Sequence, residues 1–91
     1  MTPGPLLPAR EVLANALLDA GKPADALREY EAVLTKEPNR LRATGGAALA
    51  AERSGDKQKA RLHYAKVLEL TANADSPRPE VTNAKRFLGR G

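Results

Sequence analysis

An all-α fold is predicted for this chain of 91 residues by its composition, by the helical spacing of its apolar residues and by an internal repeat of about 34 residues. Ala and Leu dominate the apolar residues, whereas the aromatic residues are limited to Tyr30, Tyr64 and Phe87. Ala, Leu, Glu, Lys and Arg are strong helix formers, while β-sheets favour β-branched and aromatic residues. The length suffices for one small domain.

The internal repeat becomes visible when the sequence is shifted against itself so that Gly21 aligns with Gly55. Identical residues then align at Ala9/Ala43, Ala14/Ala48, Ala16/Ala50, Gly21/Gly55, Ala26/Ala60, Tyr30/Tyr64, Val33/Val67 and Leu34/Leu68. A few alanine matches arise by chance in an alanine-rich chain, so the repeated glycines and tyrosines are the more informative pairs. Their spacing predicts two copies of one structural unit.

The first copy contains two predicted helices. The first covers about 8–20 and ends at Gly21, because glycine favours the position that follows a helix. Its apolar residues recur at helical spacing and are Val12, Leu13, Ala16, Leu17 and Ala20. The second covers about 23–36, begins with Pro23 in its first turn and is closed by Pro38. One face of it carries Ala26, Leu27, Tyr30, Val33 and Leu34.

The second copy is predicted to repeat this hairpin, with a third helix to about residue 53 and a fourth to about residue 71. Asn39 and Asp56 are suitable N-caps for these two helices, and Gly55 ends the third. The apolar face of the fourth helix carries Ala60, Tyr64, Val67 and Leu68.

A fifth helix is predicted after a proline-containing loop at 73–79. Ser76 and Pro77 are expected to be its N-cap and first residue. Its apolar residues recur at helical spacing and are Val81, Ala84, Phe87 and Leu88.

Two helices joined by a glycine-containing turn, with a period of about 34 residues, resemble the tetratricopeptide repeat. The family's positions correspond in the first copy to Leu13, Ala14, Leu17, Gly21, Ala26, Tyr30, Val33 and Pro38. In the second copy they correspond to Ala47, Ala48, Ala51, Gly55, Ala60, Tyr64 and Val67. Two departures are that Ala72 replaces the terminal proline, and that Arg10 and Thr44 replace the aromatic residue of the first helix.

The resemblance implies antiparallel helix-turn-helix repeats that form a fragment of a right-handed α-solenoid. We then expect a proline-rich leader at 1–7, one repeat at 8–38, a second at 39–72, the loop at 73–79, and a capping helix with its tail at 80–91. The chain resembles the C-terminal repeat region of longer bacterial members of the family. Whether it is an excised domain, a complete short protein or a self-associating subunit stays open.

Small residues are expected where the helices of each repeat cross. Ala14 against Ala26, and Ala48 against Ala60, would let two helix axes approach closely, and a larger side chain there would cost about 1–3 kcal/mol. Tyr30 and Tyr64 would fill the space between hairpins. A generic helical bundle would show similar stripes, but it would not explain the period or the paired glycines.

The resemblance also implies a peptide-binding groove along the first helix of each repeat. By position, the groove residues would be Glu11, Asn15, Leu18, Asp19, Arg42, Gly45, Leu49, Glu52 and Arg53. We expect Gly46 to serve close helix packing and Gly45 to open a small pocket in the groove.

One subfamily grips the C-terminal carboxylate of chaperones with Lys, Asn and Arg side chains, and only Asn15 matches that clamp. Glu11 stands where the first lysine would be, and Gly46 stands where the second asparagine would be. We therefore expect carboxylate ligands to be repelled at Glu11 and chaperone tails not to bind.

The sequence predicts no catalytic activity, metal site or cofactor. There is no cysteine, and His63, the only histidine, is expected on an exposed face. No phosphate-binding glycine motif occurs. The chain has no apolar run long enough to span a bilayer and no signal peptide at its start, so a cytoplasmic location is expected.

The net charge of +4 is uneven along the chain. Residues 1–40 carry five basic and six acidic side chains, and residues 41–91 carry ten and five. The basic run Lys57, Lys59 and Arg61 lacks the aromatic residues that stack on bases, which disfavours nucleic-acid binding. The favoured function is a module that binds a protein or peptide. The alternatives are a packing or structural segment excised from a larger protein and, less favoured, a basic module that associates with nucleic acid.

Overall fold

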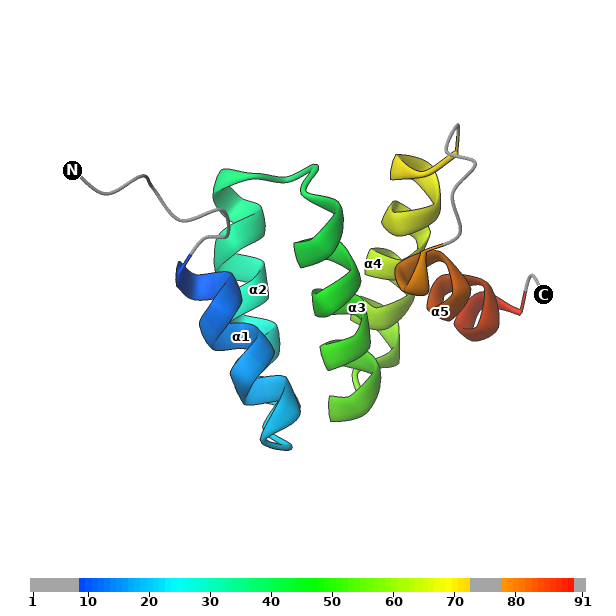
Figure 1. Cartoon of the computed structure of the whole chain (residues 1–91). Helices are drawn as coiled ribbons and strands as arrows, with labels where there is room; N and C mark the ends of the chain where they lie inside the picture. The colour runs from blue at the N-terminus through cyan, green and yellow to red at the C-terminus, as the bar shows by residue number, and fades with distance from the viewer. Residues whose placement is uncertain (1–8, 73–77, 90–91) are drawn as a thin grey trace.

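A computed structural model describes residues 9–72 and 78–89, and these residues form helices only (Figure 1). The helices are α1 (Ala9–Asp19), α2 (Pro23–Lys36), α3 (Leu41–Ser54), α4 (Lys57–Leu70) and α5 (Pro79–Leu88). The predicted all-α fold of five helices is therefore confirmed. The residues predicted to start the fifth helix, Ser76 and Pro77, lie outside the described part, and the helix begins instead at Pro79 with Arg78 as its N-cap.

The two glycine turns are the same structure at equivalent positions of the two copies. Gly21 and Gly55 have φ values of 78° and 90°, a left-handed conformation that is unfavourable for residues with a Cβ atom. The residue after each glycine donates its amide to a carbonyl five positions earlier, at 2.8 Å from Lys22 and 2.9 Å from Asp56. These bonds satisfy carbonyls at the helix ends. Glycine therefore recurs at this position because the turn needs a residue in the left-handed conformation.

The predicted N-caps have different outcomes. Asp56 caps α4 as predicted, because its Oδ1 accepts a hydrogen bond from the amide of Lys59 at 3.1 Å. The prediction for Asn39 was wrong, because Arg40 is the N-cap of α3 and no side chain caps that helix. The turn continues one residue further than expected, with the Arg40 amide donating to the carbonyl of Glu37 at 3.1 Å.

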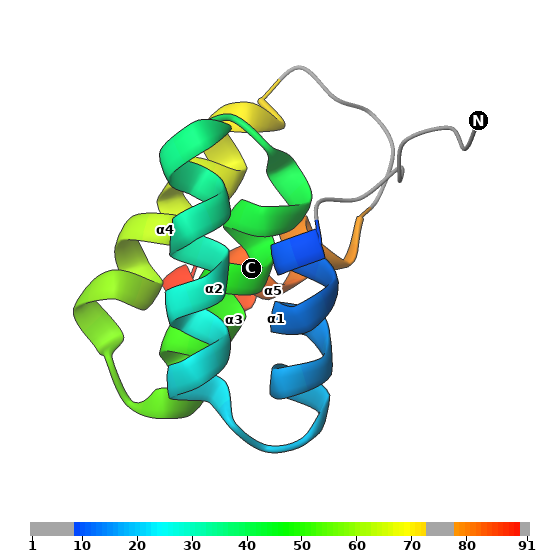
Figure 2. The ribbon, with the colours of Figure 1, turned by 90° about the vertical axis from the view of Figure 1, so that its left-hand side faces the viewer.

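The helices form two layers, with α1, α3 and α5 in one and α2 and α4 in the other (Figures 1 and 2). Each helix packs against the next along the chain, and α3 also contacts α1 and α5. The central helix α3 is consequently covered on most sides. Its buried alanines are all fully inaccessible and are Ala43, Ala47, Ala48, Ala50 and Ala51. The alanines expected at the helix crossings, Ala14, Ala26, Ala48 and Ala60, are also fully buried.

Of the predicted apolar stripe of α1, Leu17 packs against the core, where it is partly buried, and the other members are exposed. Val12 and Leu13 are 53% and 48% exposed, and α1 buries Glu11, Ala14 and Leu18 instead. At the equivalent positions of α3 stand Gly46, which lies against Tyr30 of α2, and Ala47, which is fully buried. Within the described residues, no helix covers this side of α1.

Ala16 and Ala50 occupy the same repeat position, but Ala16 is exposed and Ala50 is fully buried. Ala50→Leu should therefore lower the free energy of unfolding by about 1–3 kcal/mol through overpacking. Ala16→Leu should change it by no more than about 0.5 kcal/mol. Urea unfolding followed by circular dichroism measures both, and equal effects at the two positions would contradict this packing.

Candidate functional site

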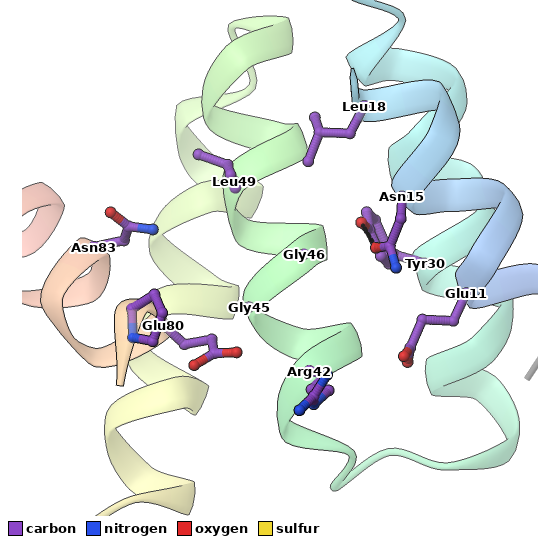
Figure 3. Close-up of a pocket in the computed structure, with 11 residues that line it drawn as sticks. Glu11, Asn15, Leu18, Tyr30, Arg42, Gly45, Gly46, Leu49, Glu80 and Asn83 are labelled. Atoms are coloured by element: carbon purple, nitrogen blue, oxygen red, sulfur yellow. Dashed lines mark hydrogen bonds between the residues drawn. The ribbon is translucent and has the colours of Figure 1, made fainter. Parts of the chain in front are cut away.

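A polar cavity of about 250 Å³ lies between α1, α3 and α5 (Figure 3). The sequence predicted six of its lining residues for the groove, and these are Glu11, Asn15, Leu18, Arg42, Gly45 and Leu49. Tyr30 of α2 and Gly46 of α3 also line it, as do Pro79, Glu80 and Asn83 of α5. Both repeats and the fifth helix thus contribute to one site.

Three predicted groove residues do not line the cavity. Asp19 and Arg53 are exposed near the C-terminal ends of α1 and α3. Glu52 instead binds other helices, because its carboxylate pairs with Arg86 of α5 at 2.8 and 3.0 Å and accepts the hydroxyl hydrogen of Tyr64 at 2.7 Å. These bonds, that of Arg86 foremost, hold the pKa of Glu52 below its ordinary value. Glu52 therefore helps to hold α5 in place.

Glu11 is almost completely buried although it carries a charge, with 1% of its surface exposed. Arg40 donates to both of its carboxylate oxygens, from Nε at 2.6 Å and from Nη2 at 3.3 Å. The hydrogen bond with Glu11 is the main cause that raises the pKa of Arg40. Because Arg40 neutralises Glu11, the expected repulsion of a carboxylate ligand by Glu11 is much weaker than the sequence suggested. The missing clamp residues still disfavour a chaperone tail.

Tyr30 fixes the wall of the cavity beside α1. Its hydroxyl donates to Oδ1 of Asn15, and its ring lies against Gly46. A methyl group at Gly46 would overlap ring atoms Cε1 and Cζ of Tyr30, so the predicted close packing at Gly46 is confirmed. Burial, followed by the nearby charges of Glu11 and Asp19, raises the pKa of Tyr30 to about 12.

Gly45 gives space to a side chain of α5. A methyl group at Gly45 would overlap Cγ of Glu80, whose side chain lies against α3 at this point. Figure 3 shows the Glu80 carboxylate between Gly45 and Arg42. Gly45 lines the cavity as hypothesised, but the space beside it is partly filled by Glu80.

The position of α5 depends on contacts with α3 and α4. Besides the ion pair of Arg86 with Glu52, the Phe87 ring packs on Tyr64 with ring centroids 5.1 Å apart. Burial, and then the hydrogen bond with Glu52, raises the pKa of Tyr64. Glu80 and Asn83 reach the cavity because α5 is held there.

Sequence reasoning did not find the contribution of α5, which it treated as a cap only. The predicted repeats were limited to 8–72, although the period continues into α5, where Ala84 and Gly89 align with Ala50 and Gly55. The stronger signal would have been the pair of glycines at 45 and 46, since two adjacent glycines inside a helix indicate close neighbours on two sides.

The cavity contains hydrogen-bonding groups, but its described lining residues form no arrangement of catalytic groups. The prediction that His63 lies on an exposed face was wrong, because its side chain is only 13% exposed and its Nε2 lies 3.3 Å from Oε2 of Glu31, between α2 and α4. In the part of the chain that the structure describes, no cluster of side chains could hold a metal ion. None of the described helices is both long and apolar enough to cross a membrane.

Comparison with known proteins identifies the repeat. The family model described as tetratricopeptide repeat matches residues 12–77, which is most of the chain. No curated protein matches the chain significantly.

The two adjacent glycines should respond differently to alanine. Alanine raises helix stability by up to about 1 kcal/mol, but at Gly46 the added methyl group meets the fixed ring of Tyr30. We expect Gly46→Ala to lower the free energy of unfolding by about 1–3 kcal/mol. Gly45→Ala should leave it unchanged or higher, because the flexible Glu80 side chain can move aside. Chemical denaturation of both variants tests this order, and the reverse order would contradict it.

The two tyrosines should resist ionisation while the chain is folded. The pKa of Tyr30 is raised from 10 to about 12, and that of Tyr64 is also raised. The stabilisation is therefore complete below about pH 10 and is lost as the pH rises through the folded-state pKa. Tyrosinate absorbance of the folded chain should stay low at about pH 10, where the chain in urea is half titrated, and rise toward about pH 12 with loss of helix. Ionisation of either tyrosine near pH 10 in the folded chain would contradict this.

Proposed function

Because the chain belongs to the tetratricopeptide repeat family, we propose that it is a protein-interaction module whose cavity between α1, α3 and α5 receives a side chain of a partner peptide. Repeats of this family generally mediate protein–protein interaction or scaffolding, and the family is typically non-catalytic. We propose the same for this chain, with no catalytic role. The cytoplasmic location stays a prediction.

The observation that carries this proposal is the convergence of six predicted groove residues on one cavity. Its volume of about 250 Å³ lies below the range of roughly 300–1,000 Å³ that is typical of small-molecule sites. A cavity of this size suits one or two side chains, with the peptide backbone outside. Leu18 and Leu49 offer apolar contacts, and Asn15 and Asn83 offer hydrogen bonds.

A second candidate function rests on the exposed stripe of α1. Val12 and Leu13 remain half exposed, and Ala16 and Ala20 continue the stripe. This surface favours a segment that packs against another folded unit, which was the alternative from the sequence. Nucleic-acid binding gains no support, because Lys59 of the basic run pairs with Glu31 at 3.2 Å.

Panning of a random peptide library displayed on phage against the immobilised chain tests the main proposal. We expect enriched peptides that no longer bind after Leu49→Trp or Asn83→Trp, because each bulky side chain would fill the cavity. Leu62→Trp is the matched control, since Leu62 is 66% exposed on α4 and lies in the other layer. Circular dichroism checks that every variant is folded. If no enriched peptide distinguishes the cavity variants from the control, the cavity is not a peptide site.

A further inference from the structure

We infer that the cavity selects a positively charged side chain, lysine or arginine, and that the carboxylate of Glu80 recognises it. The inference rests on the proposed function, because it assumes that a peptide side chain enters this cavity. It specifies the chemistry of that side chain and assigns the recognition to α5, a helix that the sequence indicated only as a cap.

Glu80 lines the cavity, and one of its carboxylate oxygens forms no hydrogen bond to any described residue. Its Oε1 atom is buried and has no hydrogen-bond partner in the structure. Burial of a carboxylate oxygen without a donor is unfavourable, because the lost hydration is not replaced. The position of Glu80 in the first turn of α5 offsets part of this through the helix dipole. A carboxylate with that role alone would remain hydrated, whereas the side chain of this one lies against α3 at Gly45 and its Oε1 is buried.

The other charges at the cavity leave Glu80 without a counter-ion. Among the described residues that line the cavity, Glu11 and Glu80 carry carboxylates, and Arg40 neutralises that of Glu11 through two hydrogen bonds. Arg42 also lines it but is exposed, and its guanidinium forms no ion pair within 4.0 Å with any described residue. Glu80 is therefore a carboxylate of the cavity wall that no described cation pairs with within 4.0 Å, although Arg42 lines the same cavity.

A cationic side chain fits these groups better than an anionic one. An ammonium or guanidinium group would supply the donors that Glu80 lacks, in a charge-assisted hydrogen bond. Asn83 of the same helix also lines the cavity and can offer a hydrogen bond to such a group. A carboxylate ligand at Glu80 would instead add a second acceptor beside Oε1, which already lacks a donor, and this is unfavourable in a partly desolvated site.

The test repeats the phage panning with the full chain and with Glu80→Gln, which keeps the shape of the side chain and removes its charge. Glu69→Gln is the matched control, because Glu69 is exposed on α4 and pairs only with nearby Lys66 among the described residues. Synthetic versions of the enriched peptides, with glutamine at each basic position in turn, are then measured by calorimetry.

We expect one lysine or arginine to be enriched at a fixed position in the selected peptides. Glu80→Gln should weaken these peptides about tenfold or more, in line with the loss of a hydrogen bond to a charged group. It should not weaken the peptide that carries glutamine at that position, and Glu69→Gln should weaken neither peptide.

Two results would overturn the inference while the proposed function stands. One is the selection of cavity-dependent peptides that have no preferred basic residue and bind Glu80→Gln as tightly as the unaltered chain. The other is an equal weakening of all peptides by Glu80→Gln with a lowered melting temperature, which would show a structural role. If no peptide depends on the cavity at all, as judged with Leu49→Trp, the proposed function fails and the inference fails with it.

Discussion

The arrangement depends on the small cross-section of α3, which allows helices to pack closely around it. Its buried alanines extend from Ala43 to Ala51, and it contacts α1, α2, α4 and α5. Each methyl group buries little apolar surface, so the helix contributes mainly by letting its neighbours approach. The larger side chains that fill the remaining space come from α2 and α4, as Tyr30 and Tyr64. Because the neighbouring helices are close, α1 and α5 can both reach the cavity across α3.

The two tyrosines perform the same task with different partners, and this difference connects the fold to the site. Tyr30 donates to Asn15, a residue of the cavity wall, whereas Tyr64 donates to Glu52, which also binds Arg86 of α5. The position of α5, and with it that of Glu80 and Asn83, therefore depends on the hydrogen bonds that Glu52 forms near the C-terminal end of α3. A change at Tyr64 or Glu52 would affect the cavity without contacting it.

Much of the fold could be predicted from the sequence, because its signals are local. The glycine turns, the first-turn proline of α2 and the Asp56 cap each depend on residues within one turn of the chain. The failures involve partners distant in sequence. From the sequence, Glu11 is expected at the surface, because its counter-ion, Arg40, lies 29 positions away along the chain. The helical spacing of α1 predicts that Val12 and Leu13 face the core, but both are about half exposed. Their counterparts on α3, Gly46 and Ala47, are the ones that pack inside. Six of the residues predicted by repeat position line the cavity, while the sequence did not indicate Glu80 and Asn83 because their placement depends on how α5 docks.

The close contact of the Tyr30 ring with Gly46 also determines which of the two repeats could be duplicated to lengthen the chain. The position of Gly46 in the second repeat is taken by Val12 in the first. A duplicated copy of α3 and α4 would again present a glycine to a preceding tyrosine, so such a copy could be added in tandem. A copy of α1 and α2 placed after α2 would present Val12 to the Tyr30 ring, where even one methyl group overlaps it. The two repeats, although alike in length and turns, are therefore not interchangeable units of growth.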